Sequence, residues 1–496
     1  MTTTQTPTPT TTGSPYLTDL VARQRAAFLR DGIPDVATRV DRLDRLEAML
    51  VESADALTAA LDLDFGTRSR ELSLAADVVG SLGEIQHQRK HVAAWTATTP
   101  VAKLAGRIGL SQRIRHDPKG VVGIIGPWNF PVQLVVVPAA SALAAGNRVV
   151  LRPSEVTAAT AQVLADAAPR WFSEDELAVV TQDQADGPAF VRAAWDHLFF
   201  TGSTAVGRLV AEAAGRNLVP VTLELGGKNP AVVDRAADVQ HAAARLADAR
   251  MVNSGQVCVC PDYVLVPREH ETAFVDAVLA TWRDRMTSVA ANDDVTSIVD
   301  DRNFARVVGL VDDAVARGAV RHAVEPHGER LPDPVRRKVP PTVLTGVAPG
   351  STILEEEVFG PVLTVHPYDD LAEAIDRINA GPSPLTIYWL GEDDERFEQL
   401  QAHTRSGSVN GNDFGLNMIN PDLPFGGVGA SGYGAYHGKA GFETFSHART
   451  VVHSRMGFSL GRMMAPPFRR RDALTSSLQL KAARRKVAKR AGRSGQ

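Results

Sequence analysis

The sequence predicts an α/β protein with two doubly wound α/β domains, and two observations in its 496 residues support that fold class. First, short apolar runs alternate with helix-patterned segments after residue 120, which is typical of buried parallel strands. Second, the alternation starts again after residue 230, with a helix-like stretch at residues 271–286. We expect strands at VVGIIG (121–126), RVVL (148–151), HLFF (197–200), VTLEL (221–225), YVLV (263–266) and LTIYWL (385–390).

The part of the chain before these strands is predicted to be helical. Residues 1–16 are rich in Thr and Pro and have neither the basic start nor the apolar run of a signal peptide, so we expect a disordered leader. Across residues 17–95 apolar side chains recur at spacings of three and four, as at Val36, Val40 and Leu43. This spacing places an apolar stripe on one helix face and indicates packing.

The composition is that of a globular protein, with 44% hydrophobic and 22% charged residues and a net charge of −4. The longest largely apolar run, Leu134 to Ala145, has 12 residues and contains Pro138, whereas a spanning helix needs about 20. The only cysteines, Cys258 and Cys260, are too few for a disulfide framework. We therefore expect a cytoplasmic protein with no transmembrane segment, no nucleic-acid partner and no metal site.

The C-terminal segment is predicted to be a basic tail, at residues 454–496. Between Phe468 and Gln496 it carries ten Lys or Arg and one Asp, a net charge of +9, which leaves −13 on the rest of the chain. Leu474 and Leu478 have helical spacing, so we hypothesise a weak peripheral contact with anionic lipid or another polyanion. A solvated, disordered tail is the alternative that the charge pattern favours.

The two cysteines lie in the stretch MVNSGQVCVCPDY. Most intracellular cysteines are small buried apolar residues, but Asn253 and Gly255 interrupt a helical pattern before Cys258, so this thiol can face a cleft. Cys258 is therefore the candidate nucleophile. In an extended segment Cys260 would point to the same face, so the spacing alone does not exclude it.

Three loops with unusual residues follow predicted strands. In PWNFP, Pro127 and Pro131 bracket Asn129 and fix its amide at the carboxyl end of a strand, where open α/β sheets bind ligands. RPSE follows the second strand. In TGSTAVG, Gly202 and Gly207 flank a helix start, where free backbone N–H groups and the helix dipole favour a phosphate.

A second glycine-rich stretch, GGVGASG, formally matches the G-x-G-x-x-G pattern of dinucleotide sites through Gly427, Gly429 and Gly432. It has no clear strand before it and no clear helix after it, as that fingerprint requires. We interpret it as a flexible loop.

Six motifs follow one another along the chain. They are PWNFP, FTGSTAVG, VTLELGGKNP, NSGQVC, EEVFGPV and LPFGGVGASGYGAYHGKAGFETFSH. In this order, and with Glu224 and Cys258 34 residues apart, they resemble the aldehyde dehydrogenase superfamily over about residues 17–453. The last motif and the CPDY continuation resemble its class 3 branch.

That resemblance implies a dinucleotide-binding domain, a catalytic domain and a small bridging or oligomerisation element. The predicted bounds are 17–96 and 119–225 for the first domain, 226–415 for the second, and 97–118 and 416–453 for the bridging element. Class 3 members are typically homodimers, so we expect a homodimer.

The resemblance also implies a mechanism. The thiolate of Cys258 attacks the aldehyde carbon, and the Asn129 amide and the Cys258 N–H stabilise the oxyanion. Glu224 is the general base that activates water to hydrolyse the thioester.

For the cofactor, the resemblance implies NAD, with NADP as the second candidate. Gly202, Ser203 and Gly207 match the pyrophosphate turn, and Glu155 matches the carboxylate that binds the adenosine ribose. The remaining cofactor residues expected are Pro127, Trp128, Leu225, Glu357, which matches the nicotinamide ribose ligand, and Phe359, which matches the residue packed near the nicotinamide.

One position departs from the family pattern, because Arg152 stands where lysine is usual. A guanidinium is a planar fork and not a mobile point charge, which affects the balance between NAD and NADP. Since Glu155 would repel a 2′-phosphate, we predict NAD as the better cofactor.

The expected activity is oxidation of a medium-chain aliphatic or aromatic aldehyde to the acid, through a cysteine thiohemiacetal and thioester. A coenzyme A-acylating dehydrogenase or reductase of related fold is an alternative, although such enzymes tend to lack the Glu224 base. A non-catalytic binding protein of the same fold is another. A cysteine hydrolase would need a histidine, and none stands in a recognisable hydrolase motif.

Overall fold

The computed structural model describes residues 14–101, 109–457, 459–467 and 470–491. The chain forms two compact units. The larger contains the described residues up to Ala97 and from His116 to Ala448, and the smaller contains those of 98–115 and of 449–491. Both predicted α/β sheets lie in the larger unit.

A block of helices opens the larger unit, as the apolar spacing predicted. The first helix begins at Pro15, because the Ser14 hydroxyl caps it by accepting a hydrogen bond from the Leu17 N–H. Residues 15 and 16 therefore belong to a helix and not to the expected leader, whose residues 1–13 lie outside the described part. The elements are α1 Pro15–Asp31, α2 Val36–Glu52, α3 Ala54–Phe65, α4 Arg70–Leu72, the π-helical η1 Ser73–Val79 and α5 Gly80–Thr96.

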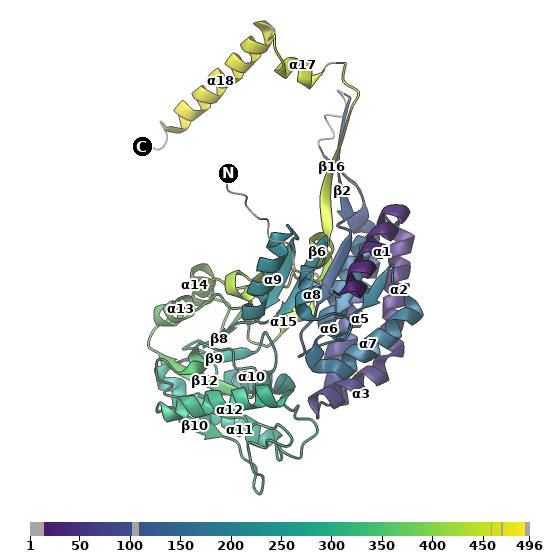
Figure 1. The fold of residues 1–496 in the computed structure, drawn as a ribbon. Helices are drawn as coiled ribbons and strands as arrows, with labels where there is room; N and C mark the ends of the chain where they lie inside the picture. Colours follow the sequence, from purple (N-terminus) through teal and green to yellow (C-terminus); the bar gives the residue numbers. More distant parts are fainter. Residues whose placement is uncertain (1–13, 102–108, 458, 468–469, 492–496) are drawn as a thin grey trace, which may run out of the picture. The chain divides into compact units, whose positions relative to one another are not determined.

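The first sheet has the strand order β15-β7-β6-β3-β4-β5, and every neighbouring pair is parallel except β15 with β7. The chain enters at β3, runs outward through β4 and β5, and continues on the other side with β6 and β7, so the predicted doubly wound arrangement is confirmed. Figure 1 shows this part of the chain in blue and teal, with the label of β6 close to those of helices α8 and α9. All four predicted strands are present, and the sequence reading missed β5 and β15. The strands are β3 Val121–Ile125, β4 Arg148–Arg152, β5 Leu177–Val179, β6 His197–Gly202, β7 Val221–Leu225 and β15 Gly432–Tyr433.

The order of this sheet determines where a ligand can bind. The strands β3 and β6 are neighbours, and the chain leaves them in opposite directions across the sheet. A crevice forms outside the carboxyl ends of strands at such a switch point. Because PWNFP follows β3 and TGSTAVG follows β6, the sheet brings these two predicted loops together.

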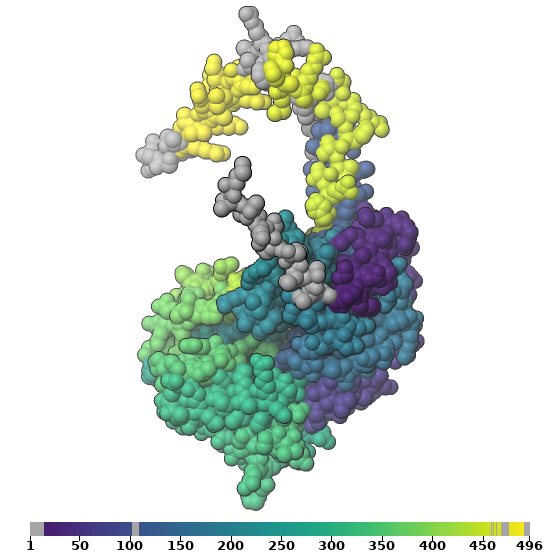
Figure 2. Space-filling view, viewed as in Figure 1, coloured from purple at the N-terminus to yellow at the C-terminus, as the bar shows by residue number. Residues whose placement is uncertain are grey.

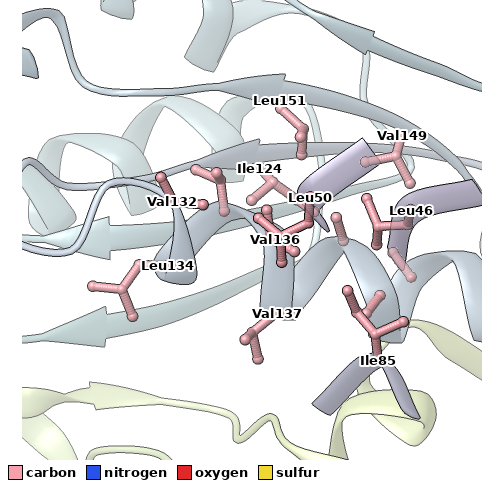
Figure 3. Close-up of a cluster of buried hydrophobic side chains, with 14 of the residues drawn as sticks. Leu46, Leu50, Ile85, Ile124, Val132, Leu134, Val136, Val137, Val149 and Leu151 are labelled. Carbon is pink, nitrogen blue, oxygen red and sulfur yellow. The ribbon is translucent and has the colours of Figure 1, made fainter. Parts of the chain in front are cut away.

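The helix α6 fixes the PWNFP loop from behind. Every residue of α6 from Leu134 to Ala145 is buried, so the 12-residue apolar run is a core helix. Figure 3 shows Leu46 and Leu50 of α2 and Ile85 of α5 gathered around side chains of α6 and of the sheet. The helices of this half are α6 Gln133–Ala145, α7 Ala158–Trp171, α8 Gly187–Arg192 and α9 Thr204–Arg216.

The second sheet has the order β10-β11-β12-β9-β8-β13-β14, and all pairs except β10 with β11 are parallel. It also starts in its middle, at β8, and extends to both sides, which confirms the second doubly wound sheet. The sequence predicted two of its strands, β9 and β13. The strands are β8 Asn229–Val233, β9 Pro261–Pro267, β10 Val320–Ala323, β11 Thr342–Thr345, β12 Val362–Tyr368, β13 Thr386–Leu390 and β14 Ser408–Gly411.

Helices cover both faces of this second sheet. Ala231 and Val233 of β8 pack with α10 and α11, whereas Val232, between them, packs with α13 on the opposite face. The space-filling view shows the residues after 230, in green, meeting the first half of the chain in one surface (Figure 2). The helices are α10 Val239–Met251, α11 Glu271–Arg285, which the sequence predicted, α12 Asp301–Ala316, α13 Leu371–Ala380 and α14 Glu395–His403, with 3₁₀ turns η3 Glu155–Thr157, η4 Val252–Gly255, η5 Arg268–His270 and η6 Thr352–Leu354.

Residues 416–448 lie in the larger unit, although the sequence assigned them to the bridging element. They form α15 Leu416–Ile419, η7 Gly429–Ser431, β15 and α16 Gly438–Thr444. The glycine-rich stretch within them is not the flexible loop we expected, because Gly432 pairs with Glu224 as an edge strand of the first sheet. Gly432 has φ +127°, and a side chain there would meet the carbonyl of Leu223, so glycine is required for this close pairing.

The smaller unit contains a three-stranded sheet of order β1-β2-β16 and two further helices. The basic tail is not disordered over residues 470–491, which form α18 with exposed side chains from Ser476 to Arg490. No helix in the described ranges has both the length and the hydropathy of a membrane span. The bounds are β1 Thr99–Pro100, β2 Leu110–Pro118, β16 Ser446–Ser454, α17 Leu460–Met464 and α18 Arg470–Ala491.

Candidate active site

A cavity of about 950 Å³ opens in the larger unit at the carboxyl ends of β3, β6 and β7, and we call it the catalytic cavity. This volume is at the upper end of the range typical of ligand sites, about 300–1,000 Å³. Ten of the thirteen predicted site residues line it. They are Pro127, Trp128, Asn129, Gly202, Ser203, Glu224, Leu225, Cys258, Glu357 and Phe359.

The loop that carries Cys258 has a strained backbone. Asn253 and Ser254 have φ of +50° and +52°, a left-handed conformation that few residues other than glycine adopt. Gly255 follows with φ +75°, and a side chain there would meet the carbonyl of Gly360. Strain of this kind persists only where the surroundings hold it, and it concentrates at functional sites.

Hydrogen bonds from buried amides hold this loop in place. The Gln256 side chain donates to the carbonyls of Asn253 (2.9 Å) and Ser297 (3.0 Å). From the start of β8, the Asn229 side chain donates to the carbonyls of Cys258 (2.7 Å) and Cys260 (3.1 Å). Side-chain amides therefore hold the backbone on both sides of Cys258.

The two cysteines have different surroundings. Cys258 is partly exposed to the catalytic cavity, whereas Cys260 is buried outside it and accepts a hydrogen bond from Arg250 at 3.4 Å. Residues 258–260 form a turn and not a strand, so the expectation that both thiols point to the same face is wrong.

Asn129 lies beside the cysteine loop and is only 3% exposed. Its side-chain amide donates to the Gln256 carbonyl at 3.1 Å. Its own carbonyl accepts from Asn253 at 3.2 Å and from the buried guanidinium of Arg68 at 2.9 Å. This brings the amide and Cys258 to the same cavity, as the sequence predicted.

Glu224 is the last residue but one of β7 and is 2% exposed. Neither of its carboxyl oxygens has a hydrogen-bond partner among the described residues. Burial therefore raises the pKa of Glu224 well above its ordinary value. A buried carboxyl without partners that lines a cavity is a candidate acid–base group.

Two carboxyl groups, Glu357 and Glu224, affect the pKa of the Cys258 thiol. Burial, followed by the charges of Glu357 and Glu224, raises the pKa of Cys258 to about 12. Burial, followed by the charge of Asp262, raises the pKa of Glu357 to about 8. The thiol thus needs a nearby proton acceptor before it can attack.

A loop from the second sheet supplies Glu357 and Phe359, and Lys228 holds that loop. The Lys228 ammonium donates to the carbonyls of Ile353 (2.8 Å) and Glu356 (3.0 Å) and pairs with Asp262. The Phe359 ring lies edge-on to Trp128, with 5.5 Å between centroids. The loops after β3 and before β12 therefore meet at this aromatic contact.

The predicted pyrophosphate turn has the geometry of an anion site. Ser203 caps α9, and its hydroxyl accepts from the Val206 N–H at 3.3 Å. The hydroxyl of Thr201, which also lines the cavity, is buried without a partner among the described residues. Gly207 does not line the cavity, because it packs against Leu225. Its lack of a side chain permits the close approach of α9 to β7.

Arg152 and Glu155 also lie outside the cavity lining, and they bind each other. The guanidinium of Arg152 is 4% exposed, forms an ion pair with Glu155 at 3.0 Å and donates to the Ala185 carbonyl at 3.3 Å. It also pairs with Gln182. The guanidinium of Arg152 is thus held between Glu155 and the loop that carries Gln182 and Ala185.

The sequence reading missed an apolar wall of the cavity. Its members are Phe414, Met418, Phe425, Tyr436 and His437. Burial, followed by the charges of Glu224 and Cys258, raises the pKa of Tyr436 well above its ordinary value, so this wall lies next to the reacting groups. Three of these residues, Phe425, Tyr436 and His437, belong to the last of the six motifs.

Comparison with known proteins agrees with this geometry. The model of the aldehyde dehydrogenase family matches residues 19–451. The chain belongs to the aldehyde dehydrogenase family. It is 43% identical over 455 residues to coniferyl aldehyde dehydrogenase of Pseudomonas sp., covering 92% of this chain and 94% of that protein.

Two further similarities extend this result. The dimeric NADP-preferring aldehyde dehydrogenase of Rattus norvegicus is 37% identical, with 91% of this chain and 98% of that protein covered. The substrate-bound structure of Staphylococcus aureus AldH superposes with a TM-score of 0.85 at 31% identity, covering 93% and 99% of the two chains. The chain is an NAD(P)-dependent aldehyde dehydrogenase that oxidises aldehydes to carboxylic acids.

Proposed function

We propose that this aldehyde dehydrogenase oxidises an aromatic aldehyde of the cinnamaldehyde class, with Cys258 as nucleophile and Glu224 as general base. The observation that carries the proposal is the joint placement of Cys258, Asn129 and Glu224 in one cavity with an aromatic wall. Flat conjugated rings pack well against aromatic side chains. The relatives named for coniferyl aldehyde support the same substrate class.

The first chemical step forms a bond between the Cys258 sulfur and the aldehyde carbon. The partly exposed thiol must first lose its proton to water in the cavity, because the thiolate is the nucleophile. Negative charge then develops on the aldehyde oxygen. One hydrogen of the Asn129 amide binds the Gln256 carbonyl, which leaves the other hydrogen, together with the Cys258 N–H, to stabilise that charge.

The residues present fit NAD(P), since the unpartnered Thr201 hydroxyl and the capped start of α9 line the cavity beside Glu357 and Phe359. When bound, the dinucleotide would supply the hydride acceptor that the oxidation of the Cys258 thiohemiacetal to the thioester requires. Gly202, Ser203 and the α9 terminus would hold its pyrophosphate. Glu357 would hold the nicotinamide ribose, with Pro127, Trp128, Leu225 and Phe359 around the ring, and Glu155, oriented by Arg152, would bind the adenosine ribose.

The second chemical step hydrolyses the thioester. Glu224 takes a proton from water as the water oxygen attacks the thioester carbon, and the Cys258 sulfur leaves. The raised pKa of Glu224 makes its ionised form a stronger base than an exposed carboxylate.

An NADH-absorbance assay tests the proposal. We expect rapid oxidation of cinnamaldehyde-type and benzaldehyde-type substrates, slower oxidation of short alkanals, and no requirement for coenzyme A. The Cys258→Ala variant is the control for reaction at another site. Oxidation of alkanals alone would contradict the substrate class, and dependence on coenzyme A would favour the acylating alternative.

We also propose that the protein is a cytoplasmic homodimer, as the dimeric rat relative suggests. For the tail we propose a weak contact with anionic lipid, because α18 exposes Leu478 and Val487 together with basic side chains along its length. Co-sedimentation with anionic vesicles at low salt should decrease when residues 468–496 are removed. Equal binding by both forms would contradict the lipid contact.

A further inference from the structure

His437 occupies an unusual backbone position in the wall of the catalytic cavity. Its φ of +73° and ψ of 142° are close to a region that essentially only glycine occupies. A non-glycine residue there costs about 1–3 kcal/mol, so the surroundings must hold it. The histidine ring is therefore maintained at this place against a backbone preference.

Hydrogen bonds fix the backbone on both sides of His437. Before it, Tyr436 exchanges two backbone hydrogen bonds with Phe425, at 2.8 and 2.9 Å. After it, the Gly438 N–H donates to the Glu84 carboxyl at 2.7 Å, and the Gly438 carbonyl accepts from Gln88 at 2.8 Å. Helix α5 and the segment before α16 thus clamp this position from residues far apart in the sequence.

The ring itself is held between aromatic side chains. It stacks on Phe425, with 5.3 Å between centroids and 26° between planes, and lies 4.4 Å from the Tyr436 ring. His437 is 9% exposed and lines the cavity, yet its Nδ1 has no hydrogen-bond partner among the described residues. A buried polar atom left without a partner is unfavourable, which points to a ligand as the missing partner.

The ring is neutral, because burial lowers the pKa of His437 to about 4. A neutral imidazole has one N–H donor and one acceptor nitrogen, and a hydroxyl group can satisfy either of them. A charged group would be poorly matched, since Phe425 and Tyr436 give this wall no counter-charge. The ligand chemistry that fits is therefore an uncharged hydroxyl on an aromatic body.

We propose that His437 forms a hydrogen bond with a hydroxyl group on the substrate's aromatic ring, so that the enzyme prefers hydroxylated over unsubstituted cinnamaldehydes. This inference rests on the proposed function and adds the residue that binds the hydroxyl group of the substrate. A site built to bind a hydroxyl discriminates against the analogue without it, because the site's polar group is then left unpaired.

A matched pair of substrates tests the inference, namely 4-hydroxycinnamaldehyde and cinnamaldehyde. For the unmodified enzyme, we expect kcat/KM to be about five- to 100-fold higher for the hydroxylated compound. In His437→Phe the ratio of the two kcat/KM values should fall to about one. His437→Asn, which keeps a donor and an acceptor on a residue that tolerates positive φ, should retain part of the preference.

The control variant is Met418→Leu, which alters the same wall without removing a polar group. It should change kcat/KM for both substrates by the same factor. Calorimetric binding of 4-hydroxycinnamate and cinnamate to the full chain gives a readout that is independent of turnover. His437→Phe should abolish the difference in affinity between these two acids.

The outcomes separate this inference from the proposed function. If the unmodified enzyme oxidises neither aromatic compound, the proposed substrate class is wrong. If it oxidises both equally, or if His437→Phe keeps the preference, the role of His437 is wrong and the proposed function stands. A parallel loss on both substrates in His437→Phe, without a change in their ratio, would assign the residue a purely structural role and overturn the inference.

Discussion

Replacing Glu224 by Gln separates the two chemical steps of the reaction. Glu224 is buried and both of its oxygens lack partners among the described residues, so the exchange breaks no internal hydrogen bond. We expect the free energy of unfolding to change by no more than about 1 kcal/mol. The loss of the base should slow thioester hydrolysis by about 10²- to 10⁴-fold.

Rapid mixing of Glu224→Gln with NAD and aldehyde measures both steps. We expect a burst of up to one equivalent of NADH per site, followed by very slow turnover, because acylation precedes the step that needs the base. Urea unfolding of the same variant confirms that the fold is intact, and Cys258→Ala should give no burst. Loss of the burst in Glu224→Gln would refute this order and show that Glu224 is already required to deprotonate Cys258, whose pKa is raised to about 12.

Three other predictions concern the thiols, the cofactor and the buried acid of α5. Cys258→Ala should lower kcat/KM by about 10⁴-fold or more, whereas Cys260→Ala should retain most activity because Cys260 lies outside the cavity. Equal losses of kcat/KM in the two variants would contradict the assignment of Cys258 as the nucleophile. The enzyme should show a higher kcat/KM with NAD than with NADP. Glu155→Ala should bring the ratio of these two kcat/KM values closer to one, since it removes the carboxylate that pairs with Arg152. A clear preference for NADP in the unmodified enzyme would contradict the role of Glu155 in selecting NAD. Burial raises the pKa of Glu84 from 4.5 to about 7, so the native state keeps a proton that the unfolded state loses. As the pH rises from 4.5 to 7, the unfolding free energy of the unmodified enzyme should therefore fall by up to about 3 kcal/mol relative to that of Glu84→Gln, measured by urea titration at each pH. The same dependence of unfolding free energy on pH in both proteins would contradict this prediction.

The parts of the site that could be predicted from sequence are those attached to strand ends. Asn129 follows β3, Gly202 ends β6 and Glu224 lies one residue before the end of β7. Parallel neighbouring strands must bring such residues to one edge. The strand and loop patterns alone therefore indicated a common site. The resemblance then supplied the roles that spacing does not encode.

The parts that could not be predicted depend on contacts between distant segments. The position of His437 is set by Glu84, which lies more than 350 residues earlier in the chain. Likewise, the contacts of Arg152 could not be predicted, because two of its partners, Gln182 and the Ala185 carbonyl, come from a separate loop. Short edge strands such as β15 escaped detection because two residues carry no periodic pattern.

Arg68 illustrates how such a contact can be tested. This buried guanidinium pairs with the buried Asp77 carboxylate at 2.6 Å and also donates to the Asn129 carbonyl. In Arg68→Met we expect a loss of about 3–5 kcal/mol in unfolding free energy, because Asp77 is left buried without its counter-charge. In the double variant Arg68→Met, Asp77→Asn that charge is absent, so most of the stability should return.

Activity should not return with the stability, because the double variant still lacks the donor to the Asn129 carbonyl. We expect kcat to stay about tenfold below that of the unmodified enzyme, since a displaced oxyanion donor weakens stabilisation of the charged intermediate. Asp77→Asn alone is the control, because it keeps Arg68 and its bond to Asn129. Recovery of full kcat in the double variant would show that Arg68 contributes only to stability. A persistent loss in kcat with restored stability, together with normal kcat in Asp77→Asn, would establish that Arg68 positions the oxyanion donor.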